Sequence, residues 1–135
     1  MVSIAPPREE QIVAACRTGF GDVLRSVVSF TPTDWEVLYT RADLEEDPAS
    51  LEARKARMVE NERLGFDSQG TYRSLAKRDD IAAAFGTYYL TIRAFEHGYL
   101  GRVIVGDTGV FVTTDEMNID AFEDVAKTLR SILGS

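Results

Sequence analysis

Residues 85–114 have the sequence FGTYYLTIRAFEHGYLGRVIVGDTGVFVTT. Three runs in this stretch are rich in β-branched and aromatic residues, and glycine and polar residues separate the runs at 96–98 and at 106–109. Because such residues favour strands and tight turns respectively, the pattern predicts three consecutive strands joined by hairpin turns, an antiparallel meander. The predicted strands are Tyr88–Phe95, Tyr99–Val105 and Val110–Thr113.

The segment after the meander has the clearest helical pattern of the chain. Between Asn118 and Gly134, apolar residues recur at intervals of three and four, so one side of a helix is continuously apolar. Acidic residues come early in the segment, while Lys127 and Arg130 come late, as the helix dipole favours. We expect this helix to pack across the meander. Its apolar positions are Ile119, Phe122, Val125, Ala126, Leu129, Ile132 and Leu133.

A hairpin is predicted in the first third of the chain. Asp22–Phe30 is rich in β-branched residues, and a proline-containing turn separates it from Trp35–Thr40, where apolar and polar residues alternate. Successive side chains of a strand point to opposite faces of the sheet. We therefore expect Trp35, Val37 and Tyr39 to share one face, with Trp35 buried.

Two further helices are predicted, one before this hairpin and one after it. Prolines and acidic residues begin the first helix, which extends over Pro7–Thr18. The second has Asp47 as its expected N-cap, Pro48 in the first helical position and Gly65 at its end. Its narrow apolar stripe predicts a helix that lies on a sheet or a partner with much of its charged surface in water. The stripe consists of Leu51, Met58 and Val59, and the charged residues interpreted as solvated include Glu52, Lys55, Glu60 and Glu62.

Residues 66–84 give the weakest signal. They are polar and irregular, so the pattern favours a surface loop, with one helical turn over 79–84. Phe66, Tyr72 and Leu75 are spaced through this polar stretch. They suggest the alternative that the segment is a lid or docks a partner.

Together these elements follow the order α-β-β-α-β-β-β-α. The order predicts an α+β fold with a five-stranded antiparallel sheet flanked by helices. With 135 residues the chain is long enough for one core without metal or disulfide support and too short for two ordinary domains. We expect residues 1–135 to form a single domain.

The composition restricts the possible partners. The net charge is −7, and such a field repels nucleic-acid phosphates, so we expect no nucleic-acid binding. Because no apolar run spans a membrane and the N-terminal residues lack a secretory pattern, we expect a cytoplasmic protein without membrane contact. The chain has 12 arginines but 3 lysines, and 11 of its 22 acidic residues are aspartate. This acidic, lysine-poor composition suggests a protein that is adapted to concentrated salt.

Three features resemble functional motifs, and each has a structural explanation. The triplet Asp107-Thr108-Gly109 occurs in aspartic proteases, but a glycine precedes it here and a hairpin turn accounts for it. His97 lies in a predicted turn without the further ligands that a metal site requires. Cys16 lies among apolar helix positions and is expected in the core. We therefore predict no enzymatic activity and no catalytic, cofactor-binding or metal-binding residues.

Two resemblances extend this interpretation. The stretch FEHGYLGRVIVGDTGVFVTTD at 95–115, followed by the terminal helix, resembles an uncharacterised family of small acidic haloarchaeal domains, a resemblance that implies no activity. The order of elements resembles the roadblock family, whose members are small α+β domains. That resemblance implies a homodimer and a protein partner such as a small GTPase.

Our leading hypothesis from the sequence is a non-enzymatic, dimer-forming interaction or regulatory domain. The alternative is a small-molecule sensor of the PAS or profilin-like kind, with its ligand between the sheet and residues 66–84. A pocket lined by Tyr88, Tyr89 or Tyr99 would favour the sensor, whereas a filled sheet face and an exposed apolar edge would favour the dimer.

Overall fold

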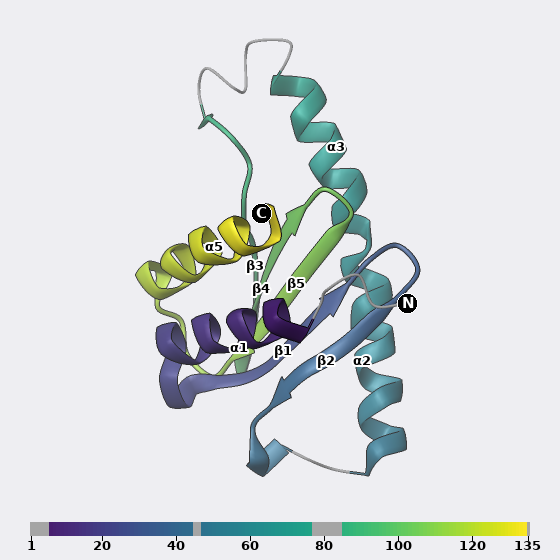
Figure 1. Cartoon of the computed structure of the whole chain (residues 1–135), viewed down its shortest axis with the longest axis vertical. Coiled ribbons are helices and arrows are strands. Elements are labelled where there is room, and N and C mark those ends of the chain that lie inside the picture. The colour runs from purple at the N-terminus through teal and green to yellow at the C-terminus, as the bar shows by residue number, and fades with distance from the viewer. Residues whose placement is uncertain (1–5, 45–46, 77–84, 135) are drawn as a thin grey trace.

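The computed structural model describes residues 6–44, 47–76 and 85–134. Within these ranges, helices lie at both ends of the chain and in its middle, and strands lie between them (Figure 1). The helices are α1 (Pro6–Phe20), α2 (Pro48–Glu62), α3 (Leu64–Ala76) and α5 (Ile119–Gly134); the strands are β1 (Leu24–Phe30), β2 (Trp35–Thr40), β3 (Thr91–Phe95), β4 (Gly98–Val105) and β5 (Thr108–Thr114).

The described strands form one five-stranded antiparallel sheet in the order β2-β1-β5-β4-β3. Helices α1 and α5 cover one face of this sheet, while α2 and α3 follow one another along the opposite face (Figure 1). The predicted meander is present as β3, β4 and β5. The predicted fold class, an α+β arrangement with a five-stranded antiparallel sheet flanked by helices, is thus confirmed.

Buried side chains form one core on each face of the sheet. On the face covered by α1 and α5, the ring of Phe122 meets the ring of Phe20 edge-on, with centroids 4.8 Å apart. The same ring lies so close to Gly101 that a Cβ there would come within 2.5 Å of it. The terminal helix therefore packs across the meander, as predicted. The buried residues of the second core are Val28, Phe30, Val59, Leu100 and Phe111.

A bulge in β2 changes which of its side chains share a face. Val27 pairs with Tyr39 and Val28 pairs with Val37, so Leu38 is an extra residue opposite β1. Trp35 and Val37 pack against the core beneath α2, whereas Leu38 and Tyr39 pack against the core beneath α1. The prediction that Tyr39 shares a face with Trp35 and Val37 is wrong, since the bulge shifts the alternation by one residue.

The first strand of the meander is shorter than predicted. It begins at Thr91, which pairs with Arg102, and not at Tyr88. Tyr89 and Leu90 nevertheless pack against the core beneath α1 and α5. Strand propensity indicates which residues favour a half-buried, extended backbone. It does not determine which of these residues pair with a neighbouring strand.

The middle of the chain differs most from the sequence prediction. Asp47 caps α2 by accepting a hydrogen bond from the backbone N–H of Ser50, as expected. The helix does not end at Gly65, however, because α2 ends at Glu62 and α3 begins at Leu64. The predicted loop is therefore helical up to Ala76, and the turn predicted at 79–84 lies outside the described residues.

No helix in the described ranges is long and apolar enough to cross a membrane.

An ionic cluster joins β1, the end of β2 and the end of β5. Arg41 donates through Nε to Asp43 at 2.6 Å and through Nη1 to Asp115, and Arg25 donates to Asp115 at 2.8 Å. These hydrogen bonds from guanidinium groups hold the pKa of Asp115 below its usual range, and Arg41 lowers the pKa of Asp43 in the same way. The cluster is therefore ionised at neutral pH and fixes this end of the sheet.

Candidate interaction surface

The outer edge of β3 is open in the described part of the chain, because β3 pairs with β4 alone. Phe95 and Gly98 flank the two-residue turn of the hairpin. In such a hairpin the pair beside the turn is hydrogen-bonded, so backbone N–H and C=O groups of Ile92 and Ala94 point away from β4. The edge thus offers unpaired groups to another strand.

Exposed aromatic residues lie at the end of this edge and in the segment that leads to it. Phe85 precedes β3 and is 84% exposed, whereas Phe95 ends β3 and is 58% exposed. Tyr72 of α3 is exposed as well, and its ring centroid lies 5.2 Å from that of Tyr88. Large apolar side chains beside an open strand edge indicate a surface that associates with something else. We refer to β3 together with Phe85 and Tyr72 as the β3 surface.

The opposite edge of the sheet is better protected. Strand β2 contains the bulge at Leu38, and its residues are half-buried along its whole length. Trp35 and Val37 contribute to the core beneath α2. Bulges interrupt the regular ladder that another strand would need, whereas the pairing of β3 with β4 has no register shift. Of the two edges, β3 is consequently the stronger candidate for an interface.

A buried ionic network anchors β3 and β4 to the junction of α2 and α3. The carboxylate of Glu62, 2% exposed, accepts hydrogen bonds from Arg102 Nη1 and Arg93 Nε, each at 2.9 Å. Arg102 is also buried, and its Nη2 donates to the hydroxyls of Tyr88 at 2.9 Å and Thr91 at 3.0 Å. One carboxylate from the helix layer thus fixes the edge strand and its neighbour.

The sequence interpretation of the charged residues of α2 as solvated is wrong for Glu62 and Lys55. Lys55 is buried, and its Nζ donates to Ser26 Oγ at 2.9 Å. One signal for the network was present in the sequence, because Arg102 stands in the middle of an apolar strand and a buried charge needs an opposite charge. Gly65 is the second signal, since a Cβ there would lie 2.4 Å from Arg102 Cζ.

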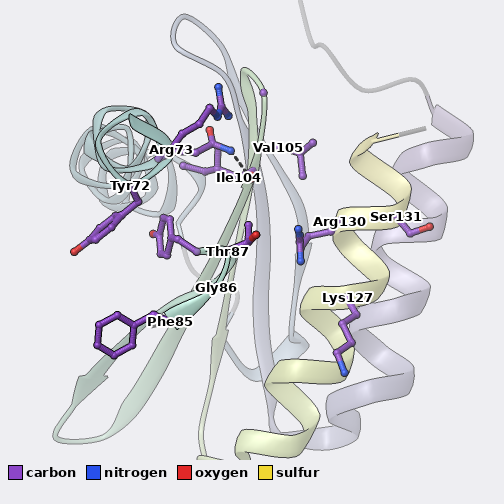
Figure 2. A pocket seen from close by; sticks show the side chains of 13 residues that line it. Tyr72, Arg73, Phe85, Gly86, Thr87, Ile104, Val105, Lys127, Arg130 and Ser131 are labelled. Carbon is purple, nitrogen blue, oxygen red and sulfur yellow. Dashed lines mark hydrogen bonds between the residues drawn. The ribbon is translucent and has the colours of Figure 1, made fainter. Parts of the chain in front are cut away.

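A cavity of about 1000 Å³ adjoins the β3 surface, between α3 and α5 at the end of the sheet where β4 turns into β5 (Figure 2). Its cationic residues come from two helices, Arg73 from α3 and Lys127 and Arg130 from α5. None of the described lining residues is acidic. The remaining lining residues are Gln69, Tyr72, Phe85, Gly86, Thr87, Tyr88, Ile104, Val105, Gly106 and Ser131.

None of the three motif-like features of the sequence is a lining residue of the cavity. Asp107 is exposed in the turn between β4 and β5, and His97 lies in the turn between β3 and β4 with 89% of its side chain exposed. Cys16 is fully buried, and burial raises the pKa of its thiol to about 12. The explanations of Asp107 as a turn residue and Cys16 as a core residue are confirmed. Within the described residues, no three His, Cys, Asp or Glu side chains gather as metal ligands would.

Residues 10–134 match the model of a protein family described as a domain of unknown function, DUF7522. The chain belongs to this family. Its matched range includes every described strand and α5, so the β3 surface and the buried network lie within the family domain. No curated protein sequence matches the chain significantly.

Solved structures with a similar fold include three of MglB. The gliding protein MglB of Thermus thermophilus is 12% identical with a TM-score of 0.56, over 96% of this chain and 93% of that one. The structure described as MglB with a tetrameric arrangement is 12% identical with a TM-score of 0.55, over 96% and 92%. Myxococcus xanthus MglB is 15% identical with a TM-score of 0.52, over 99% and 95%. These likenesses show that the fold is of the roadblock type.

Proposed function

We propose that this chain is a non-enzymatic, dimer-forming interaction or regulatory domain of the roadblock type. Residues 1–135 would act as one domain in the cytoplasm. The observation that carries the proposal is the open edge of β3, with exposed Phe95 at its end and exposed Phe85 in the segment that precedes it. The likeness to MglB supports the fold that presents this edge.

Pairing of two β3 edges would satisfy the unpaired backbone groups of both copies. Two antiparallel β3 strands related by a two-fold axis would join the sheets into one, and the exposed rings near each edge would leave water. A ladder between edge strands has few hydrogen bonds of its own, so the burial of Phe85 and Phe95 is the larger contribution. The dimer therefore depends on both the edge and its aromatic neighbours.

A proline at position 94 is expected to convert the dimer into a folded monomer. Ala94→Pro removes an outward N–H from the edge, while the hydrogen bonds between β3 and β4 remain. In the free monomer that N–H faces water, so we expect the free energy of unfolding to change by less than about 1 kcal/mol. Light scattering should report a dimer for the wild type and a monomer for the variant. Ala94→Thr retains the N–H and is the matched control.

Two outcomes of this measurement contradict the proposal. If the wild type is monomeric at every accessible concentration, the β3 edge does not form a dimer. If the wild type is a dimer and Ala94→Pro remains a dimer of equal affinity, the copies meet elsewhere. In that case the β3 edge does not carry the function.

We also propose a protein partner such as a small GTPase for the assembled dimer, in line with the resemblance to the roadblock family. The test is sedimentation of the wild type and of Ala94→Pro with the small GTPases of the source cell, each in its GDP and GTP forms. Co-sedimentation with the wild type but not the monomeric variant supports the proposal. A complete lack of co-sedimentation contradicts the small-GTPase partner while leaving the dimer proposal intact.

Adaptation to concentrated salt is a further part of the proposal. An acidic chain of net charge −7 with 3 lysines repels itself at low ionic strength, and screening by salt relieves this repulsion. Urea denaturation should accordingly show higher stability in molar KCl than in millimolar KCl. Equal stability and solubility across this range would contradict the adaptation.

A sensor of small molecules is the second candidate function. The observation that favours it is the cavity beside α3, which Tyr72 and Tyr88 line. Tyr89 and Tyr99 do not support it, because they do not line this cavity and their side chains pack against the core beneath α1 and α5. A ligand in this cavity would contact the helical part of residues 66–84, as the alternative expects.

A further inference from the structure

We infer that the cavity between α3 and α5 binds an organic anion that carries an aromatic ring, with nucleotides as the natural chemical class. The inference specifies the ligand of the second candidate function and rests on it. Phe85 and Tyr72 belong to both the cavity and the β3 surface, so the monomeric variant tests the inference apart from the dimer. The inference rests on the cationic, aromatic and hydroxyl side chains that line the cavity together.

The described lining of the cavity is cationic, whereas the chain as a whole is acidic. The chain has a net charge of −7, yet Arg73, Lys127 and Arg130 line the cavity without a lining carboxylate among the described residues. Within the same residues none of the three forms an ion pair. Arg130 instead lies over the ring of Tyr89, at 5.4 Å from the guanidinium carbon to the centroid. Three cations that lack carboxylate partners favour an anionic occupant.

Aromatic side chains line the cavity on the side away from α5. Figure 2 shows Tyr72 and Arg73 on α3 and Phe85 in the segment that leads to β3, whereas Lys127 and Arg130 project from α5. Phe85 is 84% exposed and Tyr72 is 44% exposed, so a planar group can reach each of the two rings. An exposed aromatic ring gains free energy when another ring stacks on it. A ligand whose ring stacks near Tyr72 or Phe85 and whose phosphates reach Lys127 and Arg130 fits this lining.

The size and the neutral groups of the cavity agree with a ligand of this kind. Its volume of about 1000 Å³ lies at the upper end of the range of roughly 300–1,000 Å³ that small-molecule sites occupy. Thr87 and Ser131 provide hydroxyls in the lining. Such groups can bind ribose and phosphate oxygens, since a hydroxyl both donates and accepts hydrogen bonds.

A second copy of the chain is a poorer occupant of the cavity. A two-fold interface brings the same surface of both copies together. Two sets of Arg73, Lys127 and Arg130 would then face one another, and like charges at an interface repel. The exposed β3 edge does not have this conflict, because its unpaired groups are backbone dipoles.

The test is calorimetric titration of ATP, tripolyphosphate and adenosine into the wild type and the monomeric Ala94→Pro variant at low salt. We expect ATP to bind more tightly than either tripolyphosphate or adenosine, and to bind the monomeric variant at least as tightly as the wild type, because the proposed dimer covers Phe85. The double variant Lys127→Gln/Arg130→Gln should weaken ATP binding by about tenfold or more, because each lost phosphate contact is charge-assisted. Phe85→Ala should weaken ATP and leave tripolyphosphate unchanged.

Arg57→Gln is the matched control, since Arg57 is an exposed arginine on α2 outside the cavity. Lys127 and Arg130 are themselves exposed, so their replacement leaves the core intact, and far-ultraviolet circular dichroism checks the fold. Absence of ATP binding at millimolar concentration overturns the inference. Equal affinity for tripolyphosphate and ATP overturns the aromatic part of the inference. Binding by Ala94→Pro separates these results from those on the dimer.

Discussion

Replacement of Glu62 by alanine is expected to lower the free energy of unfolding by about 3–5 kcal/mol, the usual cost of removing one partner of a buried ion pair. Glu62 and Arg102 are 2% and 3% exposed, so Arg102 would retain a buried charge without its counter-charge. Arg93 would lose the same partner. Because Nε of Arg102 already lacks a hydrogen-bond partner among the described residues, the site has no spare acceptor at hand. Urea denaturation followed by circular dichroism measures the loss.

Two variants separate the buried pair from general effects on α2. Glu60→Ala removes an exposed carboxylate that pairs with Arg63 at 3.3 Å, and we expect it to cost less than about 1 kcal/mol. Replacing both Glu62 and Arg102 by leucine and methionine should recover much of the lost stability, since no isolated charge remains buried. If Glu62→Ala costs no more than Glu60→Ala, the network does not anchor the edge strand.

Phe122→Ala is expected to be equally destabilising, at about 3–5 kcal/mol. The Phe122 side chain is buried between Phe20 of α1 and Gly101 of β4, so its loss opens a cavity where both end helices meet the sheet. Ile119→Ala on the same helix is the control, because Ile119 is half exposed and should cost about 1 kcal/mol or less. Similar losses for the two variants would contradict the packing of α5 across the meander. Thermal and urea denaturation provide the comparison.

The parts of the fold that depend on local chemistry were predictable from the sequence. Glycine and polar residues at 96–98 and 106–109 mark the turns of the meander, and the structure has turns at both places. The apolar period of 118–134 predicted a helix whose buried face includes Phe122 and Leu129. In each case the residues that decide the structure are neighbours in the sequence.

The parts that depend on distant contacts were not predictable in the same way. The residues around Leu38 alternate in the same way whether the strand is regular or bulged. The bulge therefore appears only in the pairing of β2 with β1. Gly65 and Gly70 weaken the helical signal of α3, although this helix is present and packs on the sheet. Tertiary packing therefore outweighs local propensity in the segment from Leu64 to Ala76.

The candidate site shows the same limit. An open edge is a property of strand order, and the order β2-β1-β5-β4-β3 places the first strand of the meander at the edge. The sequence indicated that an exposed apolar edge would favour a dimer, but it did not identify which strand forms such an edge. Glu62 and Arg102 are 40 residues apart, so their pairing required the crossover from α2 to β4.

A distance between spin labels tests the central claim, pairing of two β3 edges, most directly. A label on Ala94→Cys reports on β3 alone, because Cys16 is buried and a thiol whose pKa is raised to about 12 is unreactive at neutral pH. A five-residue strand is about 17 Å long, so antiparallel pairing in any register keeps the two labels within about 25 Å. We predict a narrow distribution below about 25 Å, by the same strand geometry, in the dimer of the labelled chain. A dimer whose labels lie farther apart, or a chain without any inter-protomer distance, would contradict the account.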